Sequence, residues 1–113
     1  MIELKNVYLG QPANTGVDLY TCPANIAAKV VKCTVTNDIG TADSISFHKV
    51  PSGGAVGDDN LILHDEPVGN KETIRCPEVV GQLLNAGDVI HAIPATSAQL
   101  TVSLDVVEVT QRS

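Results

Sequence analysis

The sequence predicts an all-β protein, a single antiparallel β-sandwich of about seven or eight strands that takes up residues 1–113 as one domain. Apolar and polar residues alternate over short segments, which is typical of strands with one buried face. Turn-forming residues interrupt these segments roughly every eight to twelve positions, a spacing typical of sandwiches and barrels. The pattern leaves open whether the strand order is Greek-key, jelly-roll or Ig-like.

Length and composition favour one small domain. A chain of 113 residues that is 43% hydrophobic can form one continuous core but leaves little for a second. That core must be built from Val, Ile, Leu and Ala, because the chain has one Phe, two Tyr and no Trp. No secretory signal is visible at the amino end, and no apolar run approaches the roughly 20 residues of a membrane-spanning helix. We therefore expect synthesis and assembly in a cytoplasm.

The charge balance argues against two classes of partner. Seven Lys and Arg stand against thirteen Asp and Glu, a formal net charge of −6, and no basic run occurs. Such a chain is poorly suited to phosphate backbones or anionic membranes, so neither nucleic acid nor a membrane is an expected partner. A net charge of this size also has a simple explanation, since it keeps a small domain soluble.

The clearest predicted strand covers residues 28–37. Val31, Cys33 and Val35 share one face, and the intervening residues are polar. This alternation indicates that one face packs against a core while the other meets solvent.

The next predicted strand, 44–50, repeats the alternation. Ile45 and Phe47 face inward, and the polar residues between them face outward. Residues 38–41 are rich in turn formers, so we expect strands 28–37 and 44–50 to form a hairpin.

The other elements follow from the same reasoning. Segment 51–60 concentrates Gly, Pro and Asp and is predicted to be the longest exposed loop. Pro77 and Glu78 favour a first helical turn, so one short helix is expected near 77–84. Further strands are predicted at 2–10, 17–21, 61–64, 71–76, 89–93 and 99–109.

The closing strand departs from strict alternation near its end. Val107 and Val109 are apolar residues on a face that is otherwise polar. A bulge or an interface with another subunit would explain this, and so would fraying near the terminus.

Few residues suggest catalytic or metal chemistry. No GxSxG elbow or Gly-rich phosphate loop occurs. The histidines His48, His64 and His91 could form a metal site with Asp58 or Asp65 only if folding gathered them, and their spacing gives no sign of it. We expect no catalytic residue, no metal and no cofactor.

The three cysteines, Cys22, Cys33 and Cys76, lie in no CxxC or Cys/His ligand spacing. An odd number leaves at least one unpaired if a disulfide forms. Buried, reduced thiols are the expectation.

Residues 19–109, about four fifths of the chain, resemble a group of small phage structural proteins. The resemblance is carried by LYTCPANIAAKVVKCTVTN at 19–37, FHKVPSGGAVGDDNLI at 47–62, CPEVVGQLLNAGDVIHAI at 76–93 and the closing TVSLDVVEVT. It implies a Greek-key or jelly-roll β domain and a virion component, and it brings no catalytic residue. Cysteines at 22, 33 and 76 depart from the small or branched apolar residues expected there.

These observations lead to a prediction of function. We expect a non-enzymatic virion protein, assembled in the host cytoplasm as a homo-oligomer that binds phage capsid or tail proteins. Capsid decoration or cement is the leading role, and a neck, tail or fibre component is the alternative. A carbohydrate or host-surface binding module is a further alternative, for which exposed aromatics or bound calcium would be diagnostic.

The predicted contact residues lie at edges and loops, where many weak contacts would add through symmetry and multivalency. They are Tyr8 near the amino end, Gly53, Gly54, Val56, Asp58 and Asp59 in the long loop, and Val107 and Val109 on the closing strand.

Overall fold

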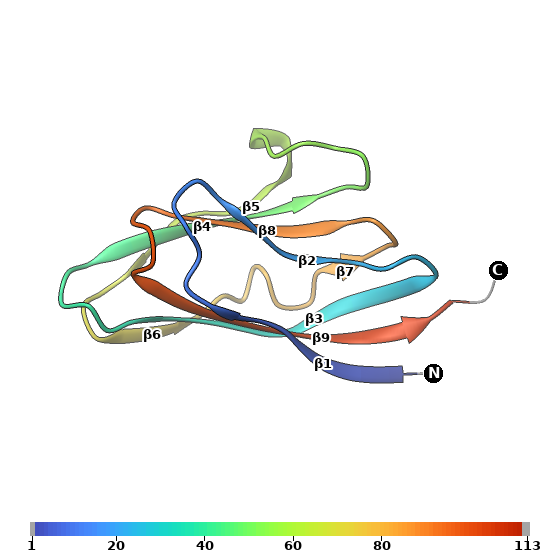
Figure 1. The fold of residues 1–113 in the computed structure, drawn as a ribbon, viewed down its shortest axis with the longest axis horizontal. Coiled ribbons are helices and arrows are strands. Elements are labelled where there is room, and N and C mark those ends of the chain that lie inside the picture. Colours follow the sequence, from blue (N-terminus) through green and yellow to red (C-terminus); the bar gives the residue numbers. More distant parts are fainter. Residues whose placement is uncertain (1, 112–113) are drawn as a thin grey trace.

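A computed structural model describes residues 2–111, which form two antiparallel sheets packed face to face (Figure 1). Sheet A has the order β1-β9-β3-β6, and the short strand β7 also pairs with β3. Its strands are β1 (Ile2–Gly10), β9 (Leu100–Thr110), β3 (Ile26–Asn37), β6 (Glu72–Arg75) and β7 (Leu83–Leu84). Sheet B has the order β2-β8-β4-β5, with β2 (Val17–Thr21), β8 (Val89–Pro94), β4 (Asp43–Val50) and β5 (Leu61–Val68).

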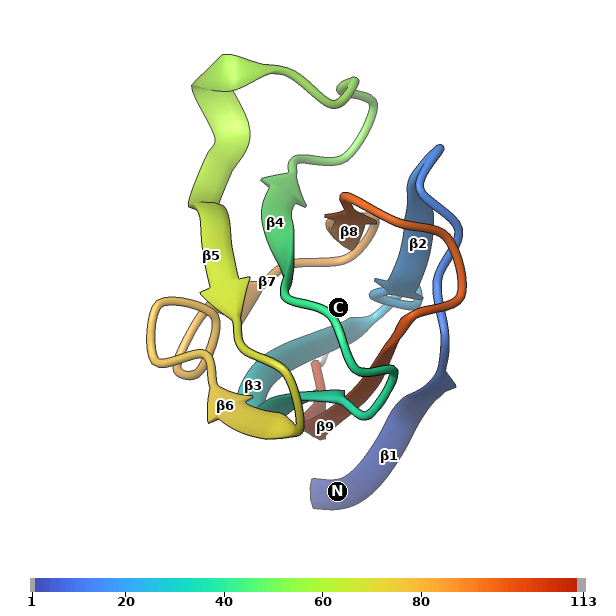
Figure 2. The ribbon, with the colours of Figure 1, turned by 90° about the vertical axis from the view of Figure 1, so that its left-hand side faces the viewer.

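The all-β sandwich prediction is confirmed, and the strand order is that of a jelly roll. The first four strands alternate between the sheets, and β6, β8 and β9 alternate again after the β4–β5 pair. The two sheets appear as separate layers in an end-on view (Figure 2). This alternation of strands between two antiparallel sheets is typical of a jelly roll, one of the strand orders that the sequence left open.

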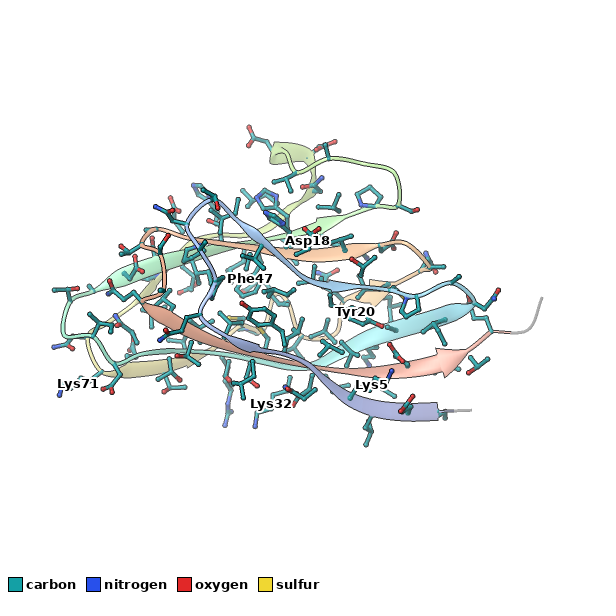
Figure 3. All side chains as sticks on the ribbon, viewed as in Figure 1. Lys5, Asp18, Tyr20, Lys32, Phe47 and Lys71 are labelled. Carbon is teal, nitrogen blue, oxygen red and sulfur yellow. The ribbon has the colours of Figure 1, made fainter. Side chains whose placement is uncertain are left out.

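The core lies between the sheets and is aliphatic. On β9 the alternate residues Leu100, Val102, Leu104 and Val106 are all fully buried, as the sequence predicted. Phe47 on β4 is also fully buried and lies between the two layers (Figure 3). The predicted inward positions of strand 44–50 are therefore confirmed.

The hairpin predicted between the strands at 28–37 and 44–50 is wrong. β3 belongs to sheet A and β4 to sheet B, so the connection crosses from one layer to the other. The buried side chain of Asn37 fixes this crossing, because its Nδ2 donates to the carbonyls of Thr41 at 2.7 Å and Val68 at 3.1 Å. Alternation shows which face of a strand is buried, but it does not identify the strand's partner.

Val31 was predicted to face the core, and this is also wrong. Val30 is fully buried and Val31 is 42% exposed. Val30 pairs with Val106 and Lys32 with Asp105, so Val31 is an extra residue in β3. This bulge reverses the alternation, and Cys33 and Val35 face the core as predicted.

No helix forms in residues 77–84. The segment is a run of turns in which the Val79 and Val80 amides donate to the Cys76 carbonyl, and it ends in β7. Gly81 has a φ of +93°, and its amide donates to the Val30 carbonyl at 2.7 Å. The bonds to β3 therefore draw the chain into the edge of sheet A before a second helical turn can form. The short helix η1 (Asp58–Asn60) lies instead in the long loop.

Candidate protein-binding surface

An apolar surface covers one end of the outer face of sheet A. Ile2 pairs with Val109 and Leu4 with Val107 across β1 and β9, and directly paired residues share a face. Ile2 and Leu4 are 71% and 77% exposed, and Val109 is 40% exposed. Four apolar side chains on two neighbouring strands therefore face solvent together.

The surface continues across the sheet. Lys29 on β3 pairs with Val107 on one side and with Leu83 of β7 on the other, so all three face outward. Leu83 is 64% exposed, and the bulged Val31 lies beside a shallow hollow that also involves Leu4. We call this surface the sheet A patch: Ile2, Leu4, Val31, Leu83, Val107 and Val109.

The sheet A patch exists because β9 stays regular to its end. Val106 and Glu108 are buried, while Val107 and Val109 point outward between them. The extra residues lie in the flanking strands, Val7 in β1 and Val31 in β3. Fraying is therefore the wrong explanation for the two valines, and the bulges lie beside the closing strand and not within it.

A polar cluster lies on the inner side of sheet A beneath this end. The Tyr20 hydroxyl donates to Glu108 Oε2 at 2.5 Å, and Lys5 Nζ lies 3.1 Å from Glu108 Oε1. Figure 3 shows Lys5 and Tyr20 at the end of the sandwich where β1 begins and β9 ends. These three side chains come from β2, β9 and β1, so the cluster ties sheet B to the edge of sheet A.

The electrostatics of the cluster follow from these contacts. The hydrogen bond from Tyr20 and the charge of Lys5 hold the pKa of Glu108 below its ordinary value. Burial and the neighbouring carboxylate raise the pKa of Tyr20, and the contact with Glu108 raises the pKa of Lys5. The cluster is thus a tyrosine donor, a carboxylate and an ammonium at neutral pH.

The predicted loop residues lie on the other side of the molecule, over sheet B (Figure 1). Gly53, Gly54, Asp58 and Asp59 are accessible to solvent, and Val56 is 41% exposed. The structure therefore separates this group from Val107 and Val109 by the full thickness of the sandwich.

The loop is internally hydrogen-bonded. Asn60 Oδ1 accepts from the Gly57 amide at 3.1 Å and contacts His48 Nδ1 at 2.9 Å, while its Nδ2 donates to the Ala55 carbonyl at 2.8 Å. The Ser52 amide donates to Asp88 Oδ1 at 3.0 Å. Asn60 thus lies against His48, which is buried although it lies on the outer face of β4.

Tyr8 does not join either group. It follows the bulge at Val7, pairs with the buried Leu104 and packs half-buried against the core. The single Phe and the second Tyr, Phe47 and Tyr20, are buried. The described residues therefore offer no exposed aromatic platform of the kind that sugar rings stack on.

The histidines do not form a metal centre within residues 2–111, where no group of three or more potential ligands was found. His48 and His91 have ring centroids 6.3 Å apart, and His91 Nδ1 contacts Asp18 Oδ1 at 2.6 Å. His64 is exposed, and its Nε2 lies 3.3 Å from Oδ2 of the adjacent residue Asp65.

Sequence reasoning found Val107 and Val109 but missed Ile2, Leu4, Val31 and Leu83. The missing information is strand register, because an apolar residue on an edge strand looks like core until its partner is known. No helix in the described part of the chain combines the length and apolar character needed to cross a membrane.

Comparisons with known proteins bear mainly on the fold. No family model and no curated protein sequence matches the chain. A solved structure from work on Bacillus endospore appendages, which form a novel family of disulfide-linked pili, is similar over 98% of this chain and 89% of that chain. The TM-score of 0.56 indicates that the two proteins share a fold. Their sequence identity is only 16%, so the similarity concerns the fold alone.

Proposed function

We propose that this protein is a non-enzymatic structural subunit that works by binding protein, both copies of itself and a larger assembly. The sheet A patch is the observation that carries the proposal. Monomeric proteins seldom expose contiguous large apolar side chains across several strands, and such patches mark interaction sites.

The charges around the sheet A patch fit a protein partner. Lys29 lies within it, and Lys32 is directed outward from the same sheet (Figure 3). Lys29 interrupts the apolar surface between Val107 and Leu83, whereas Lys32 and its partner Asp105 border it, and a polar rim is usual for a protein interface. The inward-facing Lys5 and the bulge at Val7 are features that discourage strand addition at a sheet edge, so the outer face is the better contact surface.

The kind of assembly is the finer part of the proposal. The sequence resemblance favours a phage virion, with capsid decoration as the leading role. The similarity to a structure from work on endospore appendages that form disulfide-linked pili supports a structural role. Jelly rolls also build viral capsid domains, but this is an analogy of fold.

The test is the solution mass of the wild-type protein and of two variants with single serine substitutions. Leu4→Ser removes the most exposed side chain of the sheet A patch. Leu9→Ser is the matched control, because Leu9 is 70% exposed on the same strand and pairs with Ser103 outside the patch. We expect light scattering to show wild type and Leu9→Ser above the 11.8 kDa monomer mass and Leu4→Ser at it.

A wild-type protein that is monomeric at all concentrations and does not bind purified virions or cell-surface fibres would overturn the proposal. If Leu4→Ser forms the same oligomers as wild type, the structural role stands but the contact between subunits lies outside the sheet A patch. Mass spectrometry of purified phage particles and of purified fibres from the source cells separates the two kinds of assembly.

A further inference from the structure

Two of the three cysteines lie directly opposite each other. Thr34 pairs with Arg75 in the β3–β6 ladder, so Cys33 and Cys76 are the next pair along. The Cys76 amide donates to the Cys33 carbonyl at 3.1 Å, which extends the ladder by one hydrogen bond. Opposite residues of an antiparallel pair project to the same face, and both side chains lie in the core.

The spacing of such a pair suits a disulfide. Hydrogen-bonded antiparallel partners have Cα atoms about 5.5 Å apart, within the range of about 4.4–6.8 Å seen for disulfides. The contact with Cys76, together with burial, raises the pKa of the Cys33 thiol. Within the folded core the Cys33 thiol is therefore protonated, although the geometry of the pair requires little backbone movement for a disulfide to close.

We propose that Cys33 and Cys76 form an intrachain disulfide when the protein enters an oxidising environment, fastening β6 to β3. This inference does not depend on the proposed function. A small disulfide such as oxidised glutathione is the oxidant. One cysteine sulfur bonds to a glutathione sulfur and releases the first glutathione thiol; the second cysteine then displaces the other glutathione. Two protein thiols become one disulfide, and their hydrogens end on two glutathione molecules.

The turns at 77–82 follow Cys76 directly and are fastened to β3. Val79 is fully buried in the core, and the backbone of this segment bonds to β3 through Gly81 N to Val30 O and Val30 N to Gln82 O. Both cysteines are buried in the folded protein, so an oxidant reaches the sulfurs only when the structure around them opens. Oxidation should therefore be slow in the native protein and fast during refolding.

Cys22 provides an internal control. Its Sγ lies 3.3 Å from the Ile26 carbonyl and 3.9 Å from the Leu84 carbonyl, in a different part of the core. Neither Cys33 nor Cys76 is among its hydrogen-bond partners in residues 2–111. It should remain a thiol when the pair is oxidised.

The test is refolding of the full chain with oxidised and reduced glutathione, followed by thiol counting, intact mass and peptide mapping. Wild type should lose two of its three thiols and about 2 Da, with Cys33 and Cys76 in one disulfide-linked peptide pair. Cys22→Ala should form the same disulfide, whereas Cys33→Ala should keep both remaining thiols. The oxidised protein should melt roughly 15 °C above the reduced protein, because the bond closes a loop of about 40 residues.

Three outcomes would overturn the inference: a refolded wild type with three free thiols, a disulfide that includes Cys22, or crosslinking only between chains. If Cys33→Ala does not fold, Cys33→Val restores the lost volume and tests the same thiol. The solution mass of Leu4→Ser is a separate readout, so either proposal can fail alone.

Discussion

Removing the Tyr20 hydroxyl tests whether the cluster around Glu108 stabilises the fold. Tyr20→Phe keeps the buried ring and deletes the donor that lies 2.5 Å from Glu108 Oε2. Hydrogen bonds to charged groups contribute about 1.5–3 kcal/mol. We expect the free energy of unfolding to fall by about 1.5–2 kcal/mol at pH 7, which is the lower part of that range. The reason is that Lys5, whose side chain is 42% exposed, still forms an ion pair with the Glu108 carboxylate. For a domain of this size the melting temperature should fall by about 6–8 °C.

The pH dependence of this loss distinguishes a charged partner from simple packing. Because the folded-state pKa of Glu108 is lowered, its contribution to stability is present above the ordinary value near 4.5 and disappears as pH falls through the folded pKa. The difference in unfolding free energy between wild type and Tyr20→Phe should therefore shrink between pH 7 and pH 3. Urea unfolding at both pH values measures it. A difference that is equal at both, or larger at pH 3, would refute the reasoning.

Tyr8→Phe is the matched control for that experiment. The Tyr8 hydroxyl has no hydrogen-bond partner among the described residues, and the side chain packs half-buried against the core. Its removal should change the free energy of unfolding by less than about 0.5 kcal/mol.

Two further pairs of substitutions test the backbone. Gly16→Ala should destabilise by about 2–4 kcal/mol, since Gly16 has a φ of +98° and a Cβ there would lie 2.4 Å from His91 Nε2. Gly40→Ala, at a φ of +108° with open space around it, should cost only about 1 kcal/mol, and equal melting temperatures for the two variants would contradict this. Val30→Ala should cost about 2 kcal/mol and Val31→Ala less than about 0.5 kcal/mol by urea unfolding, because the bulge buries the first and exposes the second. The reverse order would show that the bulge is misplaced.

The strands were predictable because one face of each is buried. The predicted bounds 2–10 and 17–21 agree with β1 and β2, and the alternation from Leu100 to Val106 needed no knowledge of partners. Period-2 alternation is a local property, so it can be read from a single segment of sequence.

Pairing was not predictable for the same reason. The crossing from β3 to β4 depends partly on the hydrogen bond from Asn37 to Val68, which lies 31 residues further along the chain and is not connected to Asn37 by any local pattern. The bulge places Val31 as an extra residue in β3, and nothing in the residue types around it marks the position of the bulge. The sheet A patch depends on both register and bulges, and therefore only its two β9 residues, Val107 and Val109, were singled out from sequence.

The position of β9 has a consequence for how the chain must fold. The last strand in chain order lies between β1 and β3, so sheet A has a gap in its middle until residues 100–110 are available. During synthesis β1 and β3 must leave the ribosome with no sheet A neighbour between them, and their hydrogen-bonding edges stay open until the end. Pairings between distant segments also make folding slow. A nascent chain stalled before Leu100 should therefore bind chaperones strongly, and release of the final strand should end that dependence.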